Sequence, residues 1–201
     1  SCDDDDPKPT LDIPTTYTSA SFATNVAAEN AVIDELSTLT TAANAAESDA
    51  QATTVAPISH PATLASVTLP SYKALIDDWL VEIVNAANSP TGFQNPGLGN
   101  SPAVGEEGGK LGSRLLDENG LELEQMLQKG SFGAALYNHA LTVINGDLSD
   151  ASAIDKLVEI HGADVTFDPA NTTAAATYSR RRSDLTNETG FFYDIRTALL
   201  T

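Results

Sequence analysis

Apolar residues recur at helical spacing in several separate stretches of this chain. The clearest stretch begins at Pro70, where apolar side chains return every three or four residues until about residue 88. Pro70 suits the first turn of that helix, and Gly146 and Gly162 suit the ends of two others. No segment shows the strict alternation of a half-buried strand. The pattern therefore predicts helices and no sheet, with helices at about 21–50, 70–88, 121–144, 150–160, 174–184 and 188–200.

Two long segments separate these helices. Residues 53–70 carry three prolines, and residues 89–113 are rich in glycine, proline and asparagine. Long loops in compact domains are often functional. The alternative is a mobile surface loop without a functional role. The sequence predicts an all-α fold, a helical bundle of about five or six helices with two long loops and an extended N-terminal tether. A flexible tether is expected over residues 1–18 and a helical domain over residues 19–201.

The predicted third helix contains two glycines in its interior, Gly130 and Gly133. Each costs about 1 kcal/mol relative to alanine. Close approach of a second helix would offset this cost. The alternative, which would give the glycine a functional role, is a tight binding site around Gly133. Tyr137 follows one turn later, so Gly130, Gly133 and Tyr137 are candidate ligand-binding residues. The spacing predicts a buried stripe of Leu123, Met126, Leu127, Gly130, Ala134, Tyr137, Leu141 and Ile144.

Acidic residues dominate the charge of the chain. Twenty-eight Asp and Glu face ten Lys and Arg, for a formal net charge of −18. Phosphate backbones require a basic surface, so a nucleic-acid partner is excluded. No apolar run is long enough to predict a transmembrane segment.

The single cysteine, Cys2, stands at the N-terminal end of the sequence and precedes four aspartates. One cysteine cannot form an intramolecular disulfide, and neighbouring carboxylates disfavour a reactive thiolate. Ser1-Cys2 resembles the end of a bacterial lipobox, and the acidic run resembles an export signal of surface lipoproteins. The resemblance implies lipid attachment at Cys2 and a location at the outer membrane or cell surface. An incidental cysteine after a cloning remnant is the alternative.

Two segments carry a family resemblance: LPSYKALIDDWLVEIVNAAN and ENGLELEQMLQKGSFGAALYNHAL. They resemble uncharacterised lipoproteins of the imelysin-like type, over about residues 65–200. The resemblance implies paired helical bundles linked to iron uptake, some of which have been called peptidases. The GxHxxE signature of that group is missing, since none of His60, His139 and His161 has a glutamate three residues later. No catalytic residue can be transferred, and the sequence favours a non-enzymatic protein.

Two sets of polar residues are candidate sites. His139, Glu159 and His161 would supply ligands for a metal ion if their helices packed together, although structural roles are favoured. Arg180, Arg181 and Arg182 would bind an anionic ligand, and pairing with Asp184 or Glu188 is the favoured alternative.

These observations leave three hypotheses. The first is an envelope lipoprotein whose helical domain binds a ligand or an envelope protein. The second is a metal-associated imelysin-like protein involved in iron uptake or peptide hydrolysis. The third is a structural component of an envelope complex. The last predicted helix also runs to the end of the sequence without a cap, which favours a longer natural chain over an end at Thr201.

Overall fold

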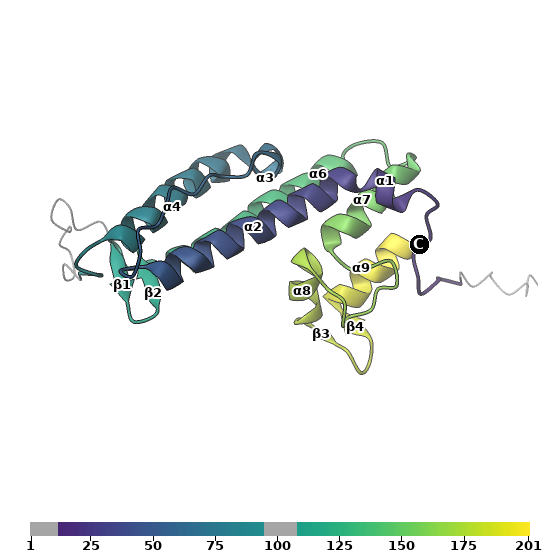
Figure 1. Cartoon of the computed structure of the whole chain (residues 1–201). Helices are drawn as coiled ribbons and strands as arrows, with labels where there is room; N and C mark the ends of the chain where they lie inside the picture. Colours follow the sequence, from purple (N-terminus) through teal and green to yellow (C-terminus); the bar gives the residue numbers. More distant parts are fainter. Residues whose placement is uncertain (1–11, 95–107) are drawn as a thin grey trace, which may run out of the picture.

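The computed structural model describes residues 12–94 and 108–201, and these residues form a predominantly helical protein (Figure 1). The prediction of an all-α bundle is confirmed. Its long elements are α2 (Ala27–Asp49), α4 (Pro70–Asn88) and α5 (Leu123–Phe132). Helix α2 packs along α5, and α5 packs along α4. The remaining helices are α1 (Phe22–Asn25), α3 (Ala62–Val67), α6 (Asn138–Ile144), α7 (Ala151–His161), α8 (Ala174–Arg180) and α9 (Phe191–Leu200).

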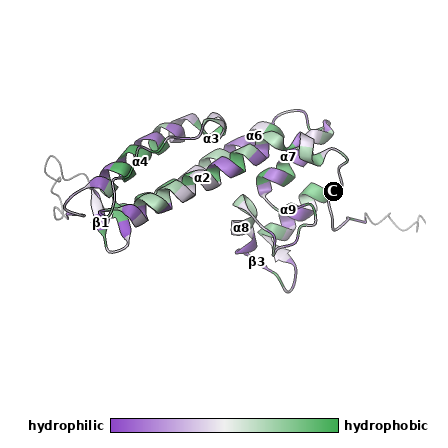
Figure 2. Ribbon diagram, viewed as in Figure 1, coloured by the Kyte–Doolittle hydropathy of each residue, from purple (hydrophilic) through white to green (hydrophobic). Residues whose placement is uncertain are grey.

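The bundle is elongated along α2 (Figure 1). One end carries a short hairpin, and the opposite end carries α7, α8 and α9. Figure 2 shows both apolar and polar residues on α4, as expected for a helix that buries one face and exposes the other. No helix within the described ranges has the length and apolar character needed to cross a bilayer.

Two hairpins are present in the described part of the chain, although the sequence pattern predicts no sheet. Strand β1 (Gly109–Leu111) pairs with β2 (Arg114–Leu116), and β3 (Ser183–Asp184) pairs with β4 (Thr189–Gly190), both antiparallel. The second hairpin shortens the predicted helices at 174–184 and 188–200. Strands of two or three residues are too short to show alternation. In the first hairpin the side chain of Leu115 is fully buried in the main core.

The predicted third helix contains a π-helical turn. Helix α5 continues through this turn, η1 (Gly133–Tyr137), directly into α6. A π turn holds more residues than an α turn and therefore rotates the residues that follow it around the helix axis. The predicted stripe is correct for Leu123 and Leu127, which are fully buried, but wrong after the turn. Tyr137, Leu141 and Ile144 are exposed, and Leu136 is buried in their place.

Two apolar clusters hold the fold together. The larger lies between α2, α4 and α5 and extends to η1, and its alanines on α2 allow close packing. The smaller joins α7, α8 and α9 around Phe167 and Phe192, both fully buried. Each large apolar side chain buried in this way contributes about 1.5–3 kcal/mol. Ile160 on α7 belongs to the larger cluster and Val158 to the smaller, so α7 connects the two.

Residues 17–25 are fixed to α7 by one buried carboxylate. Asp155 is 1% exposed. Its side chain accepts hydrogen bonds from the Tyr17 hydroxyl at 2.5 Å, the Ser19 hydroxyl at 2.8 Å and the Asn25 amide at 2.7 Å. Burial, together with the bond to Asp155, raises the pKa of the Tyr17 phenol above its usual range. The phenol therefore remains a donor at neutral pH, and chain packing begins at Tyr17, inside the predicted 1–18 tether.

Asp155→Asn is expected to release residues 17–25 from α7. The amide keeps one acceptor oxygen and places a donor against the groups that now donate to the other oxygen. The expected loss of local stability is about 2 kcal/mol, which corresponds to about thirtyfold faster chymotrypsin cleavage after Tyr17 or Phe22. Asp147→Asn, at an exposed position, is the control. Equal cleavage of the two variants would contradict this assignment.

Candidate functional site

A largely apolar pocket lies between η1 and the helices of the C-terminal part. Its volume is about 470 Å³, within the range of about 300–1,000 Å³ that is usual for ligand pockets. Helices α6, α7, α8 and α9 complete its walls. We call it the apolar pocket, and its lining residues are Phe132, Gly133, Leu136, Tyr137, Ala140, Ile144, Leu157, Ile160, His161, Ala175, Ile195, Ala198 and Leu199.

The pocket forms beside η1 because the π turn changes which residues face the core. Leu136 lies between the turn and the main apolar cluster, whereas Tyr137 is 68% exposed. The carbonyl of Ala134, within the turn, accepts a hydrogen bond at 3.1 Å from the backbone N–H of Leu69. This bond ties the turn to the residue that precedes α4. π turns inside α-helices often occur at functional sites.

His161 contributes an imidazole to the wall of the apolar pocket. It is the last residue of α7, before Gly162, which caps the helix in the left-handed conformation. The residue is 6% exposed, and its Nε2 atom is buried without a hydrogen-bond partner. Burial lowers the pKa of His161 from 6.5 to about 4. The imidazole is therefore neutral at pH 7, and the pocket wall carries no charge.

A second hollow of about 510 Å³ lies on another side of η1. It brings together Gly130, Gly133 and Tyr137, the three helix residues proposed from sequence as ligand-binding. Leu69 and Tyr72, next to Pro70 at the start of α4, form the facing wall. Gly133 and Tyr137 line both this hollow and the apolar pocket.

The two glycines are present for different reasons. A Cβ atom on Gly130 would lie 2.9 Å from the indole of Trp79, so Gly130 allows the close approach of α4 to α5. A Cβ atom on Gly133 would meet no heavy atom within 4 Å. Gly133 therefore makes no close helix contact and leaves open space at the pocket, and a binding site around it stays a prediction.

His139, Glu159 and His161 do not form a common ligand set. Within the described ranges, no group of three or more His, Cys, Asp and Glu is arranged to hold a metal ion. His139 instead pairs with Glu29 of α2, with Nε2 and Oε1 2.9 Å apart. The pKa of Glu159 is raised, first by burial and then by the nearby carboxylates of Glu29 and Asp34. The three residues therefore occupy separate environments, and the metal-associated hypothesis has no ligand set among the described residues.

The predicted pairing of the three arginines with Asp184 or Glu188 is wrong. Asp184 binds the side chain of Asn187 at 2.7 Å, and Glu188 pairs with Arg196 at 2.9 Å. No ion pair within the described part of the chain involves Arg180, Arg181 or Arg182. Arg180 ends α8, and Asp184 and Glu188 lie in the β3–β4 hairpin that follows. Cys2 lies outside the described residues.

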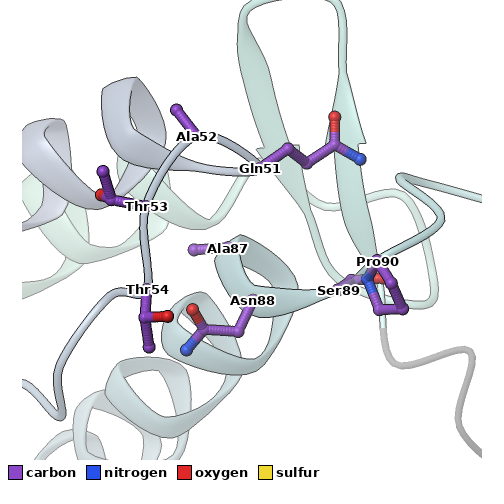
Figure 3. A pocket seen from close by; sticks show the side chains of 8 residues that line it. All are labelled: Gln51, Ala52, Thr53, Thr54, Ala87, Asn88, Ser89 and Pro90. Carbon is purple, nitrogen blue, oxygen red and sulfur yellow. The ribbon is translucent and has the colours of Figure 1, made fainter.

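A third hollow, of about 430 Å³, lies where α2 and α4 end (Figure 3). Its polar groups bind the chain itself. The side chain of Asn88 accepts a hydrogen bond from the Val55 N–H and donates one to the Val55 carbonyl, both at 2.9 Å. The Gln51 N–H donates to the Ala87 carbonyl at 3.2 Å. These bonds join the ends of the two helices.

Comparisons with protein-family models, with curated proteins and with solved structures found no match to this chain. The imelysin-like resemblance therefore stays a prediction.

The sequence analysis proposed Gly133 and Tyr137 as ligand-binding residues and His161 as a metal ligand, and it named none of the other residues of the pocket wall as site residues. Ile195 and Leu199 lie in the last predicted helix, and the structure leaves both half-buried at the pocket. Helical spacing shows that an apolar face exists. It does not show whether another element covers that face.

Proposed function

We propose that this chain is a cell-envelope lipoprotein, anchored through Cys2 at the outer membrane or cell surface, whose helical domain binds a small, largely apolar ligand. The observation that carries the proposed binding function is the apolar pocket of about 470 Å³ beside η1. Its wall is built from at least four helices that also pack in the two cores. A pocket on such packed elements is largely formed before the ligand arrives.

The neutral imidazole of His161 supports a ligand with an uncharged body. Its Nε2 atom is buried and has no hydrogen-bond partner in the protein. An unsatisfied buried polar atom costs about 1–3 kcal/mol. A ligand that offered one hydrogen-bonding group to this ring would remove that cost. The lipoprotein part of the proposal rests on Cys2 and the four aspartates that follow it.

The test is binding of N-phenylnaphthylamine, an uncharged dye that fluoresces in apolar sites. The dye is expected to bind the native chain, and Gly133→Leu is expected to weaken binding by about tenfold. The new side chain has open space at its Cβ position, and removal of a helical glycine favours the helix by about 1 kcal/mol. Gly133→Leu should therefore fold as stably as the native chain while it reduces the pocket volume.

Thr142→Leu is the matched control, because it adds the same side chain at an exposed position of α6 outside the pocket. It should bind the dye as the native chain does. No dye binding by the native chain, or equal binding by both variants, would contradict the proposed site.

A further inference from the structure

Two cations lie over the ring of one tyrosine near the apolar pocket. The ammonium of Lys129 is 5.5 Å from the centroid of Tyr178, and the guanidinium of Arg181 is 5.6 Å from it. Neither cation forms an ion pair with a carboxylate of residues 12–94 or 108–201. The chain has a net charge of −18, so a pair of cations without acidic partners makes the charge of this part of the protein opposite to that of the whole.

The cation pair is connected to the pocket through stacked aromatic rings. Tyr178 packs on Phe132 with ring centroids 4.6 Å apart. Phe132 is itself part of the wall of the apolar pocket. The cations are therefore separated from the apolar pocket by two side chains.

A small hollow lies on the other side of Phe132. Its volume is about 160 Å³, and Thr40, Gln128, Thr177 and Tyr178 contribute polar groups to its wall. Lys129 itself lines the second hollow, but its ammonium contacts two residues in the wall of the small one: it donates a hydrogen bond to the amide oxygen of Gln128 and lies over the ring of Tyr178. Phe132 therefore lines both the largely apolar pocket and the small polar hollow near the two cations.

From this arrangement we infer that the ligand of the apolar pocket is an anionic amphiphile of the fatty-acid class. Its apolar chain occupies the apolar pocket, and its carboxylate lies at the small hollow, where Lys129 and Arg181 bind it. This inference rests on the proposed binding function and names the class of ligand. Charge-assisted hydrogen bonds to a carboxylate are about twice as strong as neutral ones. The small volume of the hollow suits a carboxylate better than a bulky headgroup.

The test is displacement of N-phenylnaphthylamine from the full chain by three ligands with the same alkyl chain: decanoate, decanol and decyltrimethylammonium. Decanoate is expected to displace the dye at about tenfold lower concentration than decanol, with the cationic ligand weakest. In the variant Lys129→Gln/Arg181→Gln, decanoate and decanol should displace the dye at about the same concentration.

The variant Lys73→Gln/Arg114→Gln is the matched control. It removes the same net charge from two exposed side chains, which pair with acids on other parts of the surface. This control should keep the preference for decanoate. Equal displacement by decanoate and decanol from the native chain would overturn the inference and leave the proposed function intact. A preference that survives in Lys129→Gln/Arg181→Gln would also overturn it. Failure of the dye to bind would contradict the proposed function and remove this inference with it.

Discussion

His139→Ala is expected to lower the free energy of unfolding by about 3 kcal/mol. His139 is the hydrogen-bond partner of the Glu29 carboxylate, whose side chain is 3% exposed and whose Oε2 atom has no partner. Burial acts to raise the pKa of Glu29, but the hydrogen bond from His139 and the charges of His139 and Lys156 hold it below its usual range. The carboxylate is therefore ionised at pH 7. Without the imidazole it would be a buried charge with no partner.

Urea unfolding at pH 7 measures this loss, and a second variant isolates its cause. Glu29→Leu/His139→Ala removes the buried charge together with its partner, and it should recover most of the lost stability. A loss below about 1 kcal/mol for the single variant would contradict the assignment. A double variant no more stable than the single one would show that lost packing, and not the isolated charge, is the cause.

The second large effect is a pH dependence that belongs to His161. Its pKa is 6.5 in the unfolded chain and about 4 in the folded one, because burial disfavours the charged ring. Between these values the unfolded state binds more protons than the folded state, so stability falls as the pH falls from 6.5 to 4. The full difference corresponds to about 3 kcal/mol. His161→Leu removes the titrating group and should flatten the stability curve by that amount.

The measurement is the free energy of unfolding of the native chain and of His161→Leu at several pH values from 7 to 4. Other acidic groups titrate in both proteins, so the difference between the two curves reports His161. The difference should be constant above pH 7 and should shift in favour of the variant as the pH falls. Parallel curves throughout this range would show that the imidazole is not desolvated as the structure indicates.

Helix positions could be predicted because their signals are local. The predicted helix at 70–88 corresponds to α4, and Gly162 caps α7 as its position before a loop indicates. Proline at a first turn, glycine at a last turn and apolar residues at helical spacing act within a few residues of one another. The two hairpins were missed because strands of two or three residues are too short to show a recognisable alternation.

The candidate site was only partly visible from the sequence. Gly133 was notable as a glycine in a helix, but the sequence could not distinguish a close helix contact from open space. The partner of His139 could not be found, because Glu29 lies 110 residues away in the chain. The expected pairing of the arginines with Asp184 and Glu188 failed because nearness in sequence was taken for nearness in space.

The sequence by itself determined the helical class, the position of most helices and the acidic charge, because these follow from composition and from contacts within one or two turns. The tertiary structure alone decided the π turn at Gly133–Tyr137, the face of α6 that is exposed and the pocket between η1 and α9. Each of these depends on the balance between packing partners that are distant in the chain. An extra residue in one helical turn costs hydrogen-bond geometry locally, and the fit of Leu136 and Ala135 into the core offsets that cost.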